Sequence, residues 1–199
     1  ISNVDGTSAT SIAATKNSTD DCPAWSPDGT QVVFARTNGT TTKIQVMNAD
    51  GTWAKKDLDD GTTPCWSRTS QPADKDILYR KSGTTPGIYQ MTQAGAGSAK
   101  LVDGGSLPVW SPDGSRFLYF DAGGTLCEVK SDGSGVIVKY PGSMGRPTFN
   151  PAGTRFLSVS GSYPNRYQDD GIGVAASQTP FRSPGLPMFT GLLSWGIRY

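Results

Sequence analysis

The side chains that most often carry out catalysis are either missing from this sequence or lie outside its predicted strands. The chain of 199 residues contains no histidine, which excludes Ser–His–Asp and Cys–His catalysis and metal sites built on imidazole. It also lacks a Gly-x-Ser-x-Gly segment, which presents the nucleophile in many hydrolases. The sequence therefore predicts a protein that is not an enzyme, with no catalytic residue, no metal site and no cofactor.

Paired carboxylates are another common catalytic device, and glycoside hydrolysis needs two of them facing one cleft. Most acidic residues stand instead in short polar segments that predict turns and loops: Asp20, Asp21, Asp59, Asp60, Asp103, Asp169 and Asp170. Glu128 falls within an apolar segment that predicts a strand. A glycoside hydrolase is therefore a less favoured interpretation.

Side chains suited to binding are concentrated in residues 161–171, which predict a long loop. This segment contains Tyr163, Asn165, Arg166 and Tyr167, and Tyr and Arg are enriched at the energetic centres of interfaces. We predict these four residues as the anchors of the principal contact surface. Two alternatives stay open: the tyrosines pack on the edge of the fold, or nearby carboxylates hold Arg166 internally.

A seven-residue motif repeats along the chain at a nearly constant interval. Residues 23–29 read Pro-Ala-Trp-Ser-Pro-Asp-Gly and residues 108–114 read Pro-Val-Trp-Ser-Pro-Asp-Gly, and weaker copies occur elsewhere. The aromatic residues of the copies are Trp25, Trp66, Trp110, Phe149 and Phe189. Successive aromatic residues are 41, 44, 39 and 40 positions apart, an interval that is typical of a four-stranded propeller blade.

The segments between the copies complete the blade. Each copy precedes an apolar segment, a Gly- and Thr-rich loop, a second apolar segment and a further turn, which together predict four antiparallel strands. The Ser-Pro-Asp-Gly part favours a tight turn, in which the Asp carboxylate accepts backbone hydrogen bonds. We predict that the aromatic residue fills the wedge between neighbouring blades.

The two ends of the chain read as complementary half-blades. Residues 1–15 predict a third and a fourth strand, and residues 187–199 predict a first and a second. Because closing a ring removes open sheet edges, we predict an all-β fold, a five-bladed β-propeller of four-stranded antiparallel blades closed by N- and C-terminal strands that share one blade. The single domain, 1–199, has predicted blades at 21–61, 62–105, 106–144, 145–184, and 185–199 plus 1–20.

The sequence does not decide whether the cysteines form a disulfide or remain free. Cys22, Cys65 and Cys127 do not have metal-site spacing, and their odd number leaves at least one unpaired within the chain. Cys22 and Cys65 lie near the starts of adjacent repeats, and they either form a disulfide or are buried as small hydrophobic side chains.

The Pro-x-Trp-Ser-Pro-Asp-Gly copies and the turns that follow them resemble the repeats of the TolB-type (PD40, WD40-like) propeller family. The resemblance covers nearly the whole chain. It implies a secreted, extracellular or periplasmic protein, usually a binding scaffold and sometimes the propeller part of a peptidase. The sequence departs from TolB in lacking a separate α/β domain and in predicting five blades rather than six, so TolB's own partner is not carried over.

Net charge and composition argue against nucleic acid and membrane lipid as binding partners. The formal net charge is +1, which gives little long-range attraction to nucleic acid or to anionic lipid, and no apolar stretch is long enough for membrane insertion. We therefore expect a non-catalytic scaffold that binds a protein partner or self-assembles. The expected binding face is formed by the loops that enter each first strand and those that join second to third strands. The alternative is a lectin-like propeller that binds a glycan.

Two further features bear on location. The chain begins with Ile1 rather than Met, so we expect either a removed leader or part of a longer product. Asn17 and Asn38 stand in glycosylation sequons on predicted loops, which matter only if the source is a eukaryotic secretory pathway.

Overall fold

Every regular element that the computed structural model describes is a β-strand. The described residues are 1, 5, 7–8, 17–52, 56–69, 77–135, 138–140, 144–160, 163–168 and 179–180. They contain no helix that could cross a membrane. Their strands are β1 (Ser18–Trp25), β2 (Gln31–Asn38), β3 (Thr41–Asn48), β4 (Lys56–Asp60), β5 (Thr62–Trp66), β6 (Ile77–Lys81), β7 (Gly87–Met91), β8 (Ala99–Asp103), β9 (Ser106–Trp110), β10 (Arg116–Phe120), β11 (Leu126–Lys130), β12 (Val138–Tyr140), β13 (Met144–Phe149), β14 (Arg155–Ser160), β15 (Tyr163–Gln168) and β16 (Thr179–Pro180).

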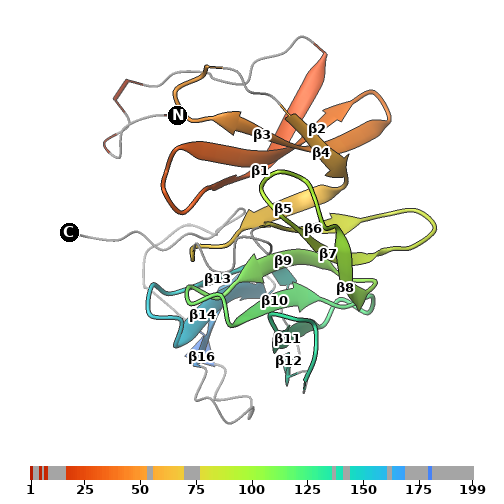
Figure 1. Ribbon diagram of the computed structural model, residues 1–199. Coiled ribbons are helices and arrows are strands. Elements are labelled where there is room, and N and C mark those ends of the chain that lie inside the picture. The colour runs from red at the N-terminus through yellow and green to blue at the C-terminus, as the bar shows by residue number, and fades with distance from the viewer. Residues whose placement is uncertain are drawn as a thin grey trace.

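The strands of the described residues form four antiparallel sheets of four strands each. The sheets are β1–β4, β5–β8, β9–β12 and β13–β16, and in each the strands follow one another in chain order. Figure 1 shows the sheets following one another from the first, in red and orange, to the last, in blue. Each sheet covers one internal repeat, which confirms the predicted four-stranded antiparallel units. The predicted fifth blade lies almost entirely outside the described residues.

A proline in each first strand interrupts the pairing of that strand with the second. Pro has no N–H to donate to the ladder, and in all four sheets the register shifts across it. The residue before the proline is left-handed in three sheets, with φ of 52° at Cys22, 50° at Thr63 and 52° at Leu107. Such a bulge sharpens the local bend and twist, so the first proline of the motif shapes the innermost strand of each blade.

The Ser-Pro-Asp-Gly segments form the predicted turns. The Asp28 carboxylate accepts hydrogen bonds from the Ser26 hydroxyl at 2.6 Å and from the Thr30 N–H at 3.0 Å. Asp113 makes the equivalent contacts at 2.5 Å and 3.1 Å. Gly29 has a φ of 70°, which a side chain would disfavour. These aspartates are therefore turn-forming residues, as predicted.

The aromatic residues of three repeats fill the wedges between neighbouring sheets, as predicted. Trp66, Trp110 and Phe149 are 4%, 5% and 4% exposed. Each packs on apolar side chains of the preceding sheet: Val33, Ala35, Ile44 and Val46 for Trp66, Cys65, Leu78 and Ile88 for Trp110, and Leu118, Phe120 and Leu126 for Phe149. The repeat motif therefore supplies the contact that joins one blade to the next.

Trp25 departs from this pattern, because it is 51% exposed. No sheet of the described residues precedes the first one, so Trp25 is not buried there, and its wedge position stays a prediction that depends on the fifth blade. Cross-strand pairing places Trp25 on the same sheet face as Val32 and Met47, which form an apolar cluster with Phe34. The fifth predicted wedge residue, Phe189, lies outside the described residues.

The first strands of three sheets meet at Arg146 on β13. Its Nη2 donates a hydrogen bond to the Pro64 carbonyl oxygen on β5 at 3.1 Å, although the two sheets are not neighbours in the chain. Burial raises the pKa of the Cys22 thiol on β1, and the charge of Arg146 acts in the opposite direction. The first strand of the fourth sheet therefore approaches the first strands of the first two sheets at Arg146.

The three cysteines and Glu128, the acidic residue predicted within a strand, are buried in the fold. Cys22, Cys65 and Cys127 are free and buried, so the small-hydrophobe alternative holds. Glu128 is also buried, and it forms an ion pair of 2.5 Å with Arg116. Arg116 also donates a hydrogen bond of 2.9 Å to the Gly153 carbonyl oxygen in the β13–β14 turn. Through Arg116, this acid helps to join two blades.

Asp59 on β4 makes the contact between the first and second sheets sensitive to acid. It accepts hydrogen bonds from Tyr79 Oη at 2.5 Å and from Lys81 Nζ at 2.7 Å, both on the next sheet. Burial acts to raise the pKa of Asp59, but these hydrogen bonds outweigh it and hold the pKa below its ordinary value of 3.8. A lowered folded-state pKa contributes stability that is present above the unfolded-state pKa and lost as the pH falls through the folded-state pKa.

We therefore expect the free energy of unfolding to fall once the pH drops below about 4. Urea unfolding between pH 7 and pH 3 measures this dependence. The Tyr79→Phe variant keeps the ring and removes one hydrogen-bond donor to Asp59, so its loss of stability on acidification should be smaller. An acid dependence equal to that of the parent would contradict the role given to Asp59.

Candidate functional site

The predicted contact residues Tyr163, Asn165, Arg166 and Tyr167 lie on a strand rather than on a loop. They belong to β15, which pairs with β14 along its whole length. The predicted loop over 161–171 is therefore wrong in this part, and the alternation Tyr-x-Asn-x-Tyr is the two-residue period of a strand. In the other sheets the position equivalent to Tyr167 is occupied by buried apolar residues, namely Met47, Met91 and Val129. The binding role of the four residues stays a prediction.

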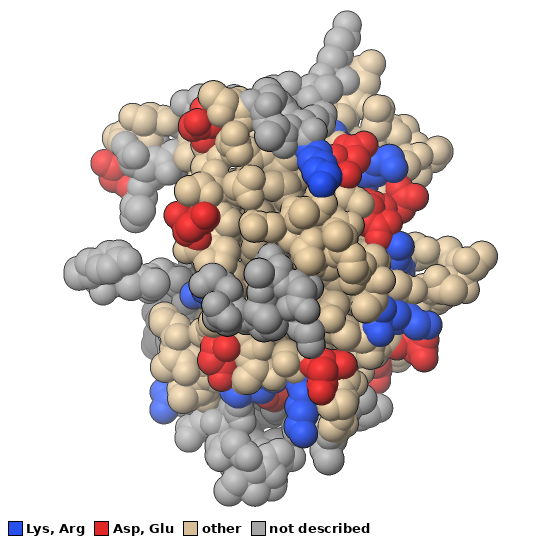
Figure 2. All heavy atoms as spheres, viewed as in Figure 1, with Lys and Arg blue, Asp and Glu red and all other residues tan. Residues whose placement is uncertain are grey.

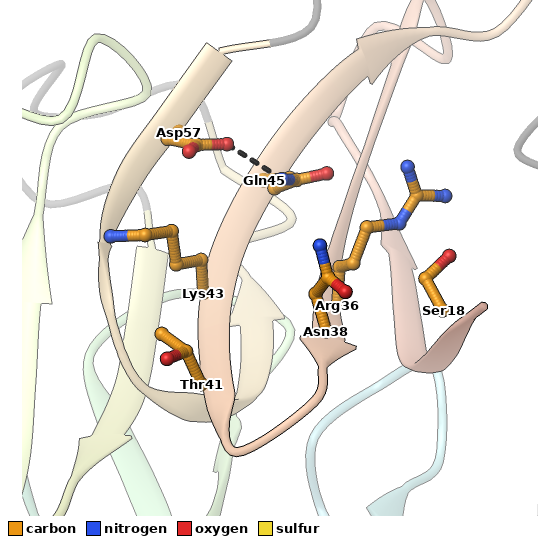
Figure 3. A pocket seen from close by; sticks show the side chains of 7 residues that line it. All are labelled: Ser18, Arg36, Asn38, Thr41, Lys43, Gln45 and Asp57. Atoms are coloured by element: carbon orange, nitrogen blue, oxygen red, sulfur yellow. Dashed lines mark hydrogen bonds between the residues drawn. The ribbon is translucent and has the colours of Figure 1, made fainter. Parts of the chain in front are cut away.

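A polar pocket of about 540 Å³ lies on the outer face of the first sheet. Its lining side chains come from all four strands of that sheet (Figure 3): Ser18, Arg36, Asn38, Thr41, Lys43, Gln45 and Asp57. Asn38 and Thr41 flank the turn between β2 and β3. The pocket therefore lies beside a loop between second and third strands, where binding was predicted. It belongs to the first sheet, however, whereas the predicted binding residues belong to the fourth.

Cross-strand register explains why these side chains share one face. Ser18 pairs with Asn38, Arg36 with Lys43, and Gln45 with Asp57, and side chains directly opposite one another in a ladder point to the same side. The same face is apolar at its other end, where Trp25 stands. The outer face of the first sheet is thus divided into an apolar half and a polar half.

The polar half contains two ion pairs, Arg36–Asp20 and Lys43–Asp60. Both nitrogen contacts of Arg36 to Asp20 are 2.5 Å long, and Arg36 is 4% exposed. This hydrogen bonding, more than any other cause, raises the pKa of Arg36. At the exposed edge, Lys43 Nζ lies 2.8 Å from Asp60. Each of these two cations therefore has its own carboxylate.

Asp57 and Gln45 form the part of the pocket whose hydrogen-bond acceptors are available to a ligand. Gln45 Nε2 donates a hydrogen bond of 2.6 Å to Asp57, which is drawn as a dashed line in Figure 3. Gln45 is 5% exposed, and its Oε1 has no hydrogen-bond partner among the described residues. Leaving a buried acceptor unpaired costs about 1–3 kcal/mol, so a donor placed in the pocket would recover that cost.

The chemistry of the pocket favours hydrogen-bond donors. Among the described residues that line it, the free acceptors are a buried amide oxygen and an exposed carboxylate, and none of these residues is aromatic. Among the described residues, no group of three or more His, Cys, Asp or Glu side chains that could hold a metal ion was found. On the face shown in Figure 2, basic and acidic side chains lie intermixed, without a large area of one charge.

Sequence analysis missed this pocket because no contiguous motif encodes it. The segment Lys-Asp-Leu-Asp-Asp at residues 56–60 and the alternation Lys43-x-Gln45 were visible signals of polar side chains on one strand face. Their meeting with Arg36 depends on the register of three strands, which includes a shift between β3 and β4. The polar run was therefore interpreted as a loop.

Comparison with known proteins identifies the fold. No protein-family model matches the chain, and no curated protein matches it. Among solved structures, TolB from Acinetobacter baumannii is similar with a TM-score of 0.65 and 19% identity, covering 80% of this chain and 43% of TolB. A chain of the nidogen/laminin complex gives a TM-score of 0.64 at 12% identity, covering 79% of this chain and 64% of its own length.

An enzyme is also among the similar structures. Oligogalacturonate lyase from Vibrio parahaemolyticus gives a TM-score of 0.62 at 10% identity, covering 86% of this chain and 56% of the lyase. The chain thus spans between 43% and 64% of the lengths of these three proteins. At such identities the likeness concerns architecture alone. The chain has the β-propeller fold of the TolB structures, which confirms at the level of fold the resemblance seen in its repeats.

Proposed function

We propose that this chain is a non-catalytic binding scaffold whose partner is a protein. The observation that carries the proposal is the polar pocket at the loop end of the first sheet, where a buried Gln45 oxygen without a hydrogen-bond partner adjoins the Asp57 carboxylate. Loops and strand ends held on a rigid sheet are common places for binding residues. Rigid strands also keep such residues in place before the partner arrives, which lowers the entropic cost of association.

The similar structures support a protein partner more than they support catalysis. One of them is a chain of the nidogen/laminin complex, which is an assembly of proteins. Oligogalacturonate lyase, as its name says, acts on a carbohydrate, and its similarity supports the glycan-binding alternative. Sugar sites often present an aromatic face to the ring, whereas the described residues that line this pocket include no aromatic side chain.

The scaffold we propose is a closed ring of five blades that works in the periplasm or outside the cell. The contact of Arg146 with β5, together with the effect of its charge on Cys22 of β1, supports closure. The hydrogen bond brings β13 to the second sheet, and the charge effect brings Arg146 near the first, as expected if one further blade completes the ring. Trp25 and its apolar neighbours would then pack against that blade, as Trp66 packs against the first sheet.

Photo-crosslinking tests the protein partner. We would place a benzoylphenylalanine at Thr40, which is exposed on the β2–β3 turn beside the pocket, and produce the chain in its source cells. The expected result is one discrete protein adduct, identified by mass spectrometry, that disappears in the Asp57→Asn background. Because the partner contacts the loop end, the same label at exposed Ala152, on a turn between first and second strands, should give no such adduct.

Two outcomes would count against this proposal. An adduct that forms equally well at Ala152 would show that the loop end of the first sheet is not the contact surface. Absence of any protein adduct at Thr40, together with specific retention of the chain by a glycan array, would favour the lectin-like alternative.

A further inference from the structure

The acceptors of the pocket indicate what kind of side chain the partner inserts. Asp57 and Gln45 lie side by side on β4 and β3, joined by their 2.6 Å hydrogen bond. Gln45 Oε1 faces away from Asp57 in Figure 3 and has no hydrogen-bond partner among the described residues. We propose that this pair receives the ammonium or guanidinium group of a Lys or Arg side chain from the protein partner. The inference rests on the proposed function and names the chemistry of the partner.

The charges around the pocket favour a cation. Arg36 is paired with Asp20, and Lys43 is paired with Asp60. Asp57 forms no ion pair among the described residues, and its one hydrogen bond there comes from a neutral amide. These two cations and three carboxylates leave one negative charge, located at Asp57. An incoming cation would balance that charge.

Donor geometry points in the same direction. A Lys ammonium carries three N–H donors and an Arg guanidinium carries five, so a group bound to the Asp57 carboxylate has further donors to offer to the Gln45 oxygen. Hydrogen bonds with an ionised partner are about twice as strong as neutral ones. A neutral polyol could satisfy the same acceptors, but it would leave the charge of Asp57 unbalanced.

The resident cations do not block the site. The guanidinium of Arg36 is held in two hydrogen bonds by Asp20 and lies 5.2 Å from the centre of the Phe34 ring. Lys43 is held by Asp60 at the outer edge. The charge of Asp57 also acts on both cations and raises their pKa. Because each cation makes its direct ion pair with another carboxylate, repulsion of a third cation at the exposed Asp57 is reduced.

A titration of the purified chain tests this inference without knowledge of the partner. The probes are N-acetyl-lysine methylamide, N-acetyl-arginine methylamide and, as the neutral polyol, sorbitol. The readout is the side-chain amide signal of Gln45 in a nitrogen–proton NMR spectrum, assigned by its loss in the Gln45→Leu variant. We expect both cationic probes to move this signal with dissociation constants on the order of millimolar, and sorbitol to leave it unmoved.

The Asp57→Asn variant separates charge from shape. Asparagine keeps an oxygen that can accept from Gln45 Nε2, so the amide should stay in place while the affinity for the cationic probes falls about tenfold. The matched control, Asp103→Asn, removes a distant exposed carboxylate that pairs with Lys100, and it should leave the titration unchanged. Equal affinity in Asp57→Asn and parent, or a shift with sorbitol alone, would overturn the inference.

This result is separable from that of the crosslinking experiment. If the cationic probes fail but the Thr40 adduct still forms, the partner binds the loop end through other contacts and only the present inference is wrong. If the probes bind but no adduct forms, the pocket takes a cation and the proposed protein partner is wrong.

Discussion

Replacing Trp110 with alanine is expected to lower the free energy of unfolding by about 3–5 kcal/mol. Trp110 is 5% exposed and packs between the second and third sheets, where its ring meets Phe117 edge-on at 5.7 Å. The truncation removes the contact between two blades and leaves a cavity that neighbouring β-sheets cannot easily collapse to fill. Urea unfolding at pH 7, followed by circular dichroism, measures the change.

A conservative substitution at the same position serves as the control. The indole Nε1 of Trp110 is buried without a hydrogen-bond partner among the described residues, and the fourth repeat has Phe149 at the equivalent position. Trp110→Phe keeps an aromatic wedge and removes the unpaired N–H, so its cost should be below about 1.5 kcal/mol. A Trp110→Ala variant as stable as the parent would show that this residue does not join the blades.

The repeat made the blade architecture predictable because its features are local. The interval between aromatic residues, the Ser-Pro-Asp-Gly turns and the apolar segments each depend on a few neighbouring residues, and the structure has them as predicted. The bulge before each first-strand proline was encoded just as locally, since Pro lacks the N–H that a ladder needs. It was missed because that proline was treated only as a marker of the repeat.

The candidate site was not predictable in the same way, because it depends on which residues face one another across strands. Gln45 and Asp57 are 12 positions apart and meet through a ladder whose register shifts by a bulge. For Tyr163 and Tyr167 on β15, the prediction of a loop was wrong for a different reason. Their polar composition and flanking glycines indicated a loop, whereas pairing with the apolar strand β14 made the segment a strand.

Replacing Trp25 with alanine is expected to destabilise the chain by about 3 kcal/mol if a fifth blade closes the ring. In a closed ring Trp25 is equivalent to Trp66 and Trp110, each of which packs on the preceding sheet. In an open arrangement its ring is 51% exposed, and truncation should cost about half as much or less, because less apolar area is lost from the interior. Unfolding in urea beside Trp110→Ala provides the comparison.

The closed ring is the central claim about this molecule, and hydroxyl-radical footprinting of the unmodified chain tests it most directly. The oxidation rates of the peptides that contain Trp25 and Trp110 are measured by mass spectrometry in the native state and in urea. If the fifth blade covers the first sheet, both tryptophans will be protected in the native state to a similar degree. If Trp25 is oxidised nearly as fast in the native state as in urea while Trp110 is protected, the outer face of the first sheet is open and the five-bladed ring is wrong.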